Sequence, residues 1–208
     1  MPALTKTDML RVPSDPLENA LWRKAMLERA NRDREYREAL WFEARDNSEF
    51  FFDAFLWTHN PRLPAGERAV PFILWDYQRE GVQEVGEHIT AGRDLFDEKS
   101  RDMGWTWTLL GVLLHDWRFV EDFLAHIGSR KEELVDNRGD MDTHFERVRF
   151  MLYRLPWWMV PAGFDGNAHD KHCLLVNPEN GSRISGESAN QDFGRQGRYT
   201  VAVLDEYQ

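Results

Sequence analysis

The sequence predicts an α/β protein with a largely parallel sheet, preceded by a helical N-terminal region. In the later part of the chain, short β-rich runs alternate with helical stretches, as they do in parallel sheets with crossover helices. In the earlier part, apolar residues recur at helical spacing between dense charges. We therefore expect a helical region over residues 1–60 and an α/β domain over residues 61–208.

Composition indicates a folded domain with an aromatic core, because 208 residues include nine tryptophans and thirteen phenylalanines. The net charge of −10 gives no general attraction to nucleic acid, so any DNA contact requires a local patch. The single cysteine, Cys173, excludes an internal disulfide and fits a reducing compartment. The N-terminus lacks the apolar region of a signal peptide, and the apolar run 109–114 is too short to cross a bilayer. We expect a cytosolic protein with no membrane partner.

The N-terminal region is expected to be a helix over residues 16–46, followed by a short helix over residues 48–57. Asp15 supplies a capping side chain, and Pro16 suits the first helical turn. Residues 28–38 are almost wholly charged. This segment is either a solvated helix face or an arm that docks on a partner.

The α/β region contains one strong hairpin signal and one helix expected to be buried. Asn180-Gly181 separates two β-rich runs, and a helix over residues 105–115 is apolar nearly all round. The expected helices cover residues 77–90, 105–115, 129–134 and 140–155. The expected strands cover residues 94–97, 123–127, 172–177, 182–185 and 199–204.

The segment 99–106, Lys-Ser-Arg-Asp-Met-Gly-Trp-Thr, has the length and the ending of a phosphate-binding loop, G-x-x-x-x-G-K-[ST]. Trp105 occupies the usual lysine position, and Lys99 occupies the position of the first glycine. Backbone N–H groups at a helix N-terminus bind phosphate, so Lys99 would add positive charge and Thr106 would bind Mg²⁺. The loop residues expected to bind ATP are Lys99, Ser100, Arg101, Asp102, Met103, Gly104, Trp105 and Thr106. The alternative is an ordinary turn before a helix.

Two further features suit a nucleotide site. The strand over residues 201–204 ends in Asp205 and Glu206, where Asp205 would hold Mg²⁺ and Glu206 would polarise the attacking water. Upstream of the loop, the amide of Gln78 offers both a donor and an acceptor to an adenine edge. The alternatives are an acidic strand end at a turn and a surface glutamine.

Together these segments resemble the large terminase subunit of tailed bacteriophages and related prophages. The resemblance runs from about Asn47 to the end of the chain. The loop 99–106, in which the lysine stands at the start, is close to diagnostic of this family. The segments that carry it are 71–78, 99–107, 129–136, 186–190 and 203–206.

The resemblance implies a P-loop NTPase core of the ASCE or RecA-like type and an ATPase motor that packs viral DNA into a procapsid. Its implied cofactors are ATP and Mg²⁺. Its implied partners are double-stranded viral DNA, the portal protein, the small terminase subunit and further copies of the chain in a ring, in the host cytoplasm at the portal. By position, Gln78 would contact adenine, Lys99 phosphate, and Thr106 and Asp205 Mg²⁺. Glu206 would be the catalytic carboxylate.

The resemblance also implies an arginine finger between neighbouring subunits, for which Arg195 is the first candidate and Arg198 the second. The sequence given stops two residues after Glu206. We therefore expect part of an ATPase domain, truncated after the strand over residues 201–204 that would be its Walker B strand, without the nuclease domain or nuclease activity of the family.

Two other functions remain open: a non-catalytic terminase fragment that acts only by docking, and another P-loop DNA translocase such as a helicase. Residues 169–173, His-Asp-Lys-His-Cys, contain zinc-type ligands. Alternation along a strand would point His172 and Cys173 to opposite faces, so a strand entry is the favoured interpretation.

Overall fold

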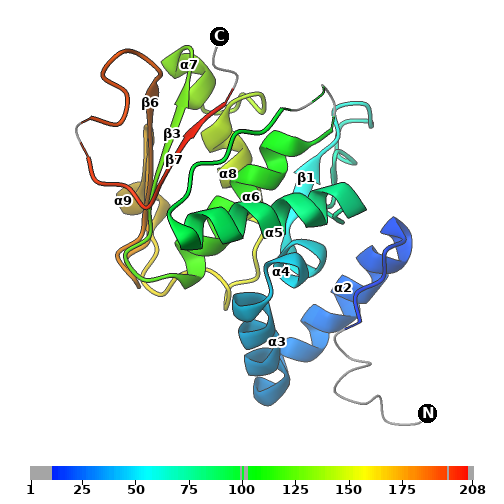
Figure 1. The fold of residues 1–208 in the computed structure, drawn as a ribbon. Helices are drawn as coiled ribbons and strands as arrows, with labels where there is room; N and C mark the ends of the chain where they lie inside the picture. Colours follow the sequence, from blue (N-terminus) through cyan, green and yellow to red (C-terminus); the bar gives the residue numbers. More distant parts are fainter. Residues whose placement is uncertain (1–10, 99, 101–102, 196, 206–208) are drawn as a thin grey trace. The chain divides into compact units, whose positions relative to one another are not determined.

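The computed structural model describes residues 11–98, 100, 103–195 and 197–205, which form a mixed α/β structure of two compact units (Figure 1). The first unit ends at Trp75 and the second begins at Asp76. The expected boundary after residue 60 lies between the two strands of a hairpin in the first unit. No helix among the described residues is long and apolar enough to cross a membrane.

The first unit contains three helices and a two-stranded antiparallel sheet in its described part. They are α2 (Pro16–Ala30), α3 (Arg34–Asp46), α4 (Ser48–Phe55), β1 (Trp57–His59) and β2 (Ala69–Pro71). The predicted cap is confirmed, since the Asp15 side chain accepts from two backbone N–H groups at the start of α2. The single helix predicted over residues 16–46 is wrong, because Asp33 leaves the helical conformation and caps α3 by accepting from Tyr36 N–H.

The second unit contains a five-stranded mixed sheet with the order β4-β5-β6-β3-β7. The strands are β3 (Leu124–Ser129), β4 (Asp170–Lys171), β5 (Leu174–Val176), β6 (Arg183–Ser188) and β7 (Val201–Leu204). Strand β3 pairs in parallel with β6 and β7, whereas β5 pairs antiparallel with β4 and β6. The hairpin prediction is confirmed, but the sheet is mixed rather than largely parallel because tight connections reverse the chain on both sides of β5.

Helix α6 is the central helix of the second unit. It packs against β3 and β6 and also contacts α5 and α8 (Figure 1). Its side chains are buried from Leu110 to Leu114, as the apolar sequence predicts. The helices of the unit are α5 (Asp76–Ala91), α6 (Trp105–Phe119), α7 (Glu132–Val135), α8 (His144–Leu152) and α9 (Gly166–His169).

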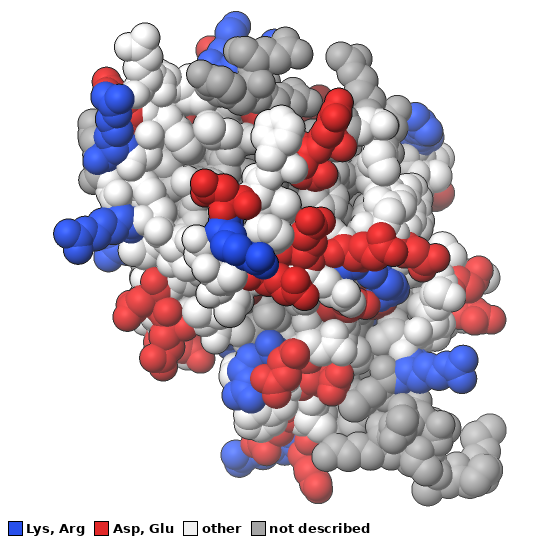
Figure 2. Space-filling model, in the orientation of Figure 1, with Lys and Arg blue, Asp and Glu red and all other residues white. Residues whose placement is uncertain are grey.

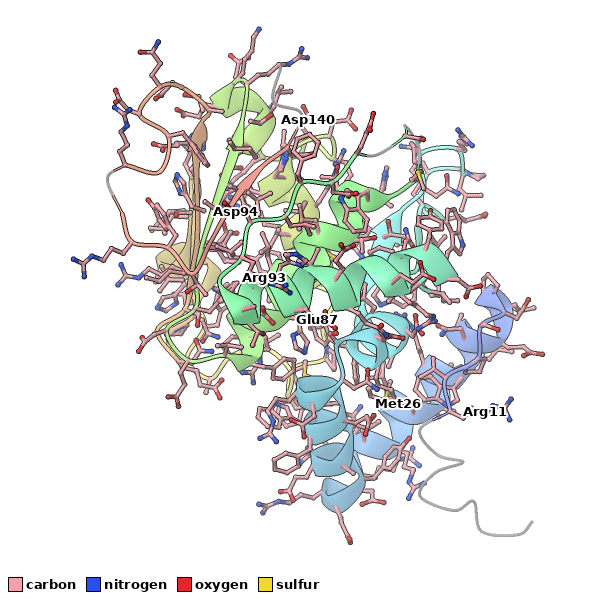
Figure 3. The ribbon with its side chains drawn as sticks, viewed as in Figure 1. Arg11, Met26, Glu87, Arg93, Asp94 and Asp140 are labelled. Atoms are coloured by element: carbon pink, nitrogen blue, oxygen red, sulfur yellow. The ribbon has the colours of Figure 1, made fainter. Side chains whose placement is uncertain are left out.

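The strand predicted over residues 94–97 is wrong. Residues 91–98 are exposed and form no strand, and Arg93 and Asp94 lie in the connection that follows α5 (Figure 3). Phe96 is 95% exposed, so its ring finds no core to pack against. Three acidic residues in 94–98 disfavour a strand, and the sheet contains no described strand that pairs with this segment.

Candidate functional site

The carboxyl end of β7 meets the N-termini of α6 and α8. The Thr106 hydroxyl, in the first turn of α6, donates to Asp205 Oδ2 over 2.9 Å. Asp205 follows β7 directly, and its backbone N–H continues the ladder by donating to Gly128 O. The same Oδ2 lies 3.2 Å from Nε2 of His144, the first residue of α8. Ligands of α/β sheets bind at the carboxyl ends of parallel strands, so the three side chains mark a candidate site.

Gly104 gives the loop its turn into α6. Its φ of 67° and ψ of 11° lie in the left-handed region, where a side chain is strained. A Cβ at this position would also lie 3.0 Å from Gln78 Nε2. The first backbone N–H groups of any helix lack partners within the helix, so this turn leads into an end suited to anions.

Gln78 is buried and contacts the loop from α5. Its Nε2 donates to Met103 O over 3.1 Å, and the Tyr77 hydroxyl donates to the same carbonyl over 2.7 Å. Two donors thus fix the residue before Gly104. The structure gives Gln78 a role in positioning the loop, while its contact with adenine stays a prediction.

Trp105, in the usual lysine position, packs against α5. A Cβ added at Gly81 would lie 2.2 Å from the Trp105 ring, so the two helices approach closely at this glycine. The indole therefore fills a contact between α5 and α6. This packing gives a physical reason for an aromatic residue where a phosphate-binding loop usually carries lysine.

His144 is a residue of this site that no pattern in the sequence predicts. Its side chain is 7% exposed, and Nδ1 lies 3.0 Å from Leu134 O, so Nδ1 must carry the proton that this carbonyl accepts. Its Nε2 makes no hydrogen bond to any described residue, although it faces the Asp205 carboxylate. A single histidine at a helix start carries no signal in the sequence, and only folding brings it to Asp205.

The connection between β6 and β7, which carries both arginine-finger candidates, is anchored at His126. This buried imidazole stacks on Phe193 and Tyr199, with centroid distances of 4.9 Å and 4.3 Å. His126 Nε2 also lies 3.0 Å from Glu187 Oε1, which accepts from Gly194 N–H. These two hydrogen bonds lower the pKa of Glu187, the backbone N–H having the larger effect.

The remaining predicted site residues are either exposed or outside the described part of the chain. Arg195 and Arg198 are exposed on the connection before β7, and Arg195 pairs with Asp192 at 2.9 Å. Ser100 is exposed. Four predicted site residues, Lys99, Arg101, Asp102 and Glu206, lie outside the described residues.

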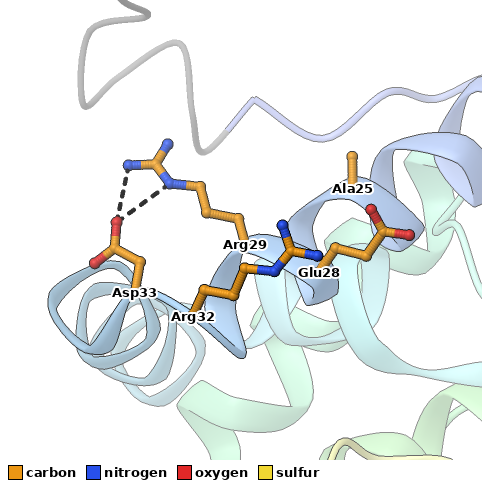
Figure 4. A pocket seen from close by; sticks show the side chains of 5 residues that line it. All are labelled: Ala25, Glu28, Arg29, Arg32 and Asp33. Carbon is orange, nitrogen blue, oxygen red and sulfur yellow. Dashed lines mark hydrogen bonds and ion pairs between the residues drawn. The ribbon is translucent and has the colours of Figure 1, made fainter.

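A shallow pocket lies in the first unit, where α2 ends and α3 begins (Figure 4). It is lined by Ala25, Glu28, Arg29, Arg32 and Asp33. Two of these lining residues, Arg29 and Asp33, form an exposed ion pair at 3.3 Å. The pocket contains none of the predicted ATP-binding residues.

Acidic and basic side chains are interspersed over the face drawn in Figure 2. This distribution accompanies the net charge of −10.

Comparison with models of known protein families and with curated protein sequences gave no match.

Proposed function

We propose that this chain is a P-loop ATPase segment that binds and hydrolyses Mg²⁺-ATP, and that it belongs to a DNA-packaging motor of the terminase large-subunit type. The hydrogen bond between Thr106 and Asp205 carries the proposal. The sequence predicts each of these residues to bind Mg²⁺. They lie 99 positions apart in the chain, yet Thr106 Oγ1 and Asp205 Oδ2 are 2.9 Å apart. In P-loop NTPases the loop hydroxyl and the aspartate at the end of a strand hold the same ion.

The surrounding geometry supports an anion next to this pair. The loop turns at Gly104 directly into α6, and α6 packs on the parallel part of the sheet. Phosphates would then contact the α6 N-terminus, and Mg²⁺ would lie between them and the two oxygen ligands. Lys99 would supply the charge that Trp105 cannot, and Glu206 would activate water.

Within such a motor, the exposed Arg195 or Arg198 would reach the nucleotide of a neighbouring subunit. Double-stranded DNA, the portal protein and the small terminase subunit are the proposed partners. An acidic chain would bind DNA through a local surface rather than through its net charge.

The test compares ATP binding and turnover of the wild type with Thr106→Ala, Asp205→Asn and Glu206→Gln. We expect Glu206→Gln to lower turnover about a hundredfold or more while ATP still binds, because it removes the base and leaves the phosphate contacts. The two Mg²⁺ ligand variants should weaken Mg²⁺-dependent binding. Thr90→Ala and Asp140→Asn are controls at exposed positions and should behave as wild type.

The remaining alternatives give different results. A docking fragment would bind no nucleotide and would show no turnover in any variant. A helicase would separate DNA strands in an ATP-dependent assay, whereas the packaging motor translocates duplex DNA without separating it. Unchanged nucleotide affinity in Lys99→Ala would contradict the proposal that Lys99 supplies the positive charge that Trp105 cannot.

A further inference from the structure

Three metal-type ligands from two separate segments meet on the surface of the second unit. They are the carboxylate of Glu132, at the start of α7, and the side chains of His172 and Cys173, in the turn between β4 and β5. One ligand atom from each residue lies within 4.8 Å of the other two. None of the three belongs to the Thr106 and Asp205 site.

The turn conformation brings His172 and Cys173 together. Neighbouring side chains on a regular strand would point to opposite faces, and a strand is what the sequence predicts here. Cys173 instead has a φ of 52°, in the left-handed region that few non-glycine residues adopt. Its sulfur therefore lies 3.7 Å from His172 Nε2.

The distances suit a tetrahedral zinc ion. With Zn–N near 2.0–2.1 Å and Zn–S near 2.3 Å, tetrahedral ligands place nitrogen and sulfur about 3.6 Å apart. The observed separation is 3.7 Å. The Glu132 Oε1 to His172 Nε2 distance is 2.9 Å, so this pair would open by about 0.4 Å to reach the same geometry.

A second carboxylate orients the imidazole. Asp136 Oδ2 lies 3.5 Å from His172 Nδ1, and the Asp136 side chain is itself fixed by Arg149 and by the Cys173 N–H. A proton on Nδ1 directed toward Asp136 leaves the lone pair of Nε2 facing Glu132 and Cys173. Metal-bound histidines are held in this way by a carboxylate on the other ring nitrogen.

We propose that Glu132, His172 and Cys173 bind one zinc ion, with water as the fourth ligand. Thiolate, imidazole and carboxylate together favour zinc over Mg²⁺, which takes oxygen ligands. Cysteine binds zinc as the thiolate, so binding forms a Zn–S bond and releases the thiol proton to solvent.

Bound zinc would join α7 to the β4–β5 turn. Helix α7 follows β3 in the chain, whereas β4 and β5 lie on the opposite side of β6 in the sheet. The ion would therefore link the connection after β3 to the antiparallel edge. A ligand of the folded state raises its stability, so the melting temperature should rise with zinc concentration.

The test uses the 208-residue chain, freed of metal, without nucleotide, and titrated with Co²⁺ and then with Zn²⁺. We expect one Co²⁺ per chain, a thiolate-to-cobalt charge-transfer band, and displacement of Co²⁺ by Zn²⁺. Cys173→Ser should abolish the band, and Glu132→Gln and His172→Asn should each weaken zinc binding about tenfold or more. Glu133→Gln, next to Glu132 and exposed, and His88→Asn on α5 are the matched controls and should bind as wild type.

Absence of the band in the wild type would show that the cluster is an ion pair only and would overturn the proposal. Equal zinc affinity of Glu132→Gln and Glu133→Gln would overturn it as well. Because Cys173→Ser could unfold, X-ray absorption of the zinc-loaded wild type gives an independent result. One sulfur near 2.3 Å supports the site, and a shell of nitrogen and oxygen alone contradicts it.

Discussion

Trp105 shows at the residue scale how a departure from a motif can have a packing cause. Its ring lies so close to Gly81 that any side chain there would overlap the indole. The position where a phosphate-binding loop would carry lysine is thus occupied by a residue that joins α5 to α6. Glycine is needed at position 81 because of this contact and not for its backbone freedom.

We expect Gly81→Ala to lower the free energy of unfolding by about 1–3 kcal/mol, because overpacking forces the Trp105 ring or α5 to shift. Urea unfolding of the purified chain measures this change. Gly86→Ala, on the same helix, has no atom within 4 Å of the added Cβ. It should instead stabilise by about 0.5–1 kcal/mol through helix propensity. Two changes of the same sign and size would contradict the packing argument.

At the scale of elements, the β6–β7 connection depends on one strand position in β3. A Cβ at Gly128 would lie 2.3 Å from the Phe193 ring, which stacks on His126. The lack of a side chain at position 128 therefore leaves the space in which Phe193 lies against β3.

We expect Gly128→Ala to displace Phe193 and to expose the connection. Trypsin should then cleave after Arg195 or Arg198 faster than in the wild type, because local opening rises when its anchoring contacts are lost. Timed proteolysis followed by mass spectrometry identifies the cut. Gly86→Ala is the control, and an unchanged cleavage rate in Gly128→Ala would show that Phe193 is not the anchor.

A buried ion-pair network joins further elements. Arg149 of α8 donates to Asp136 over 2.5 Å and 2.9 Å and to Asp170 over 2.8 Å and 3.1 Å. Tyr153 also donates to Asp170. Although burial alone would raise the pKa of Asp136, the Arg149 side chain and the Cys173 N–H hold it below its usual value.

The lowered pKa of Asp136 makes the stability of the fold depend on pH in a defined direction. An aspartate whose pKa is lower in the folded state contributes stability above its unfolded pKa, near 3.9, and loses it as pH falls through the folded pKa. We expect the free energy of unfolding to decrease as pH falls below about 4, and Asp136→Asn to reduce that slope.

Asp136→Asn should also destabilise the fold by about 3–5 kcal/mol at neutral pH, because it leaves buried Arg149 partly uncompensated. Urea unfolding across the pH range measures both effects. Asp142→Asn is the control, since this side chain is 94% exposed and lies 3.7 Å from Arg147. A pH slope in Asp136→Asn equal to that of the wild type would contradict the assignment.

At the scale of the whole molecule, local signals predicted most elements of the second unit. Helices α5 and α6, strand β3 and the hairpin before β6 arise from apolar patterns and turn residues that act over a few positions. The predicted strand at 94–97 fails because a strand requires a partner, which a local pattern cannot supply. The predicted single helix over residues 16–46 is wrong because the capping aspartate Asp33 lies within a charged run, where nothing local distinguishes a cap from a solvated charge.

The sequence by itself determined the α/β class, the cap at Asp15 and the chemical types of the residues at Gly104, Thr106 and Asp205. Tertiary structure alone decided that Thr106 meets Asp205, that His144 faces the same carboxylate, and that Glu132 lies beside His172 and Cys173. The physical reason is the distance along the chain over which each interaction acts. Caps and apolar periodicity act between residues a turn apart, whereas a site depends on which distant segments the sheet order and helix packing bring together.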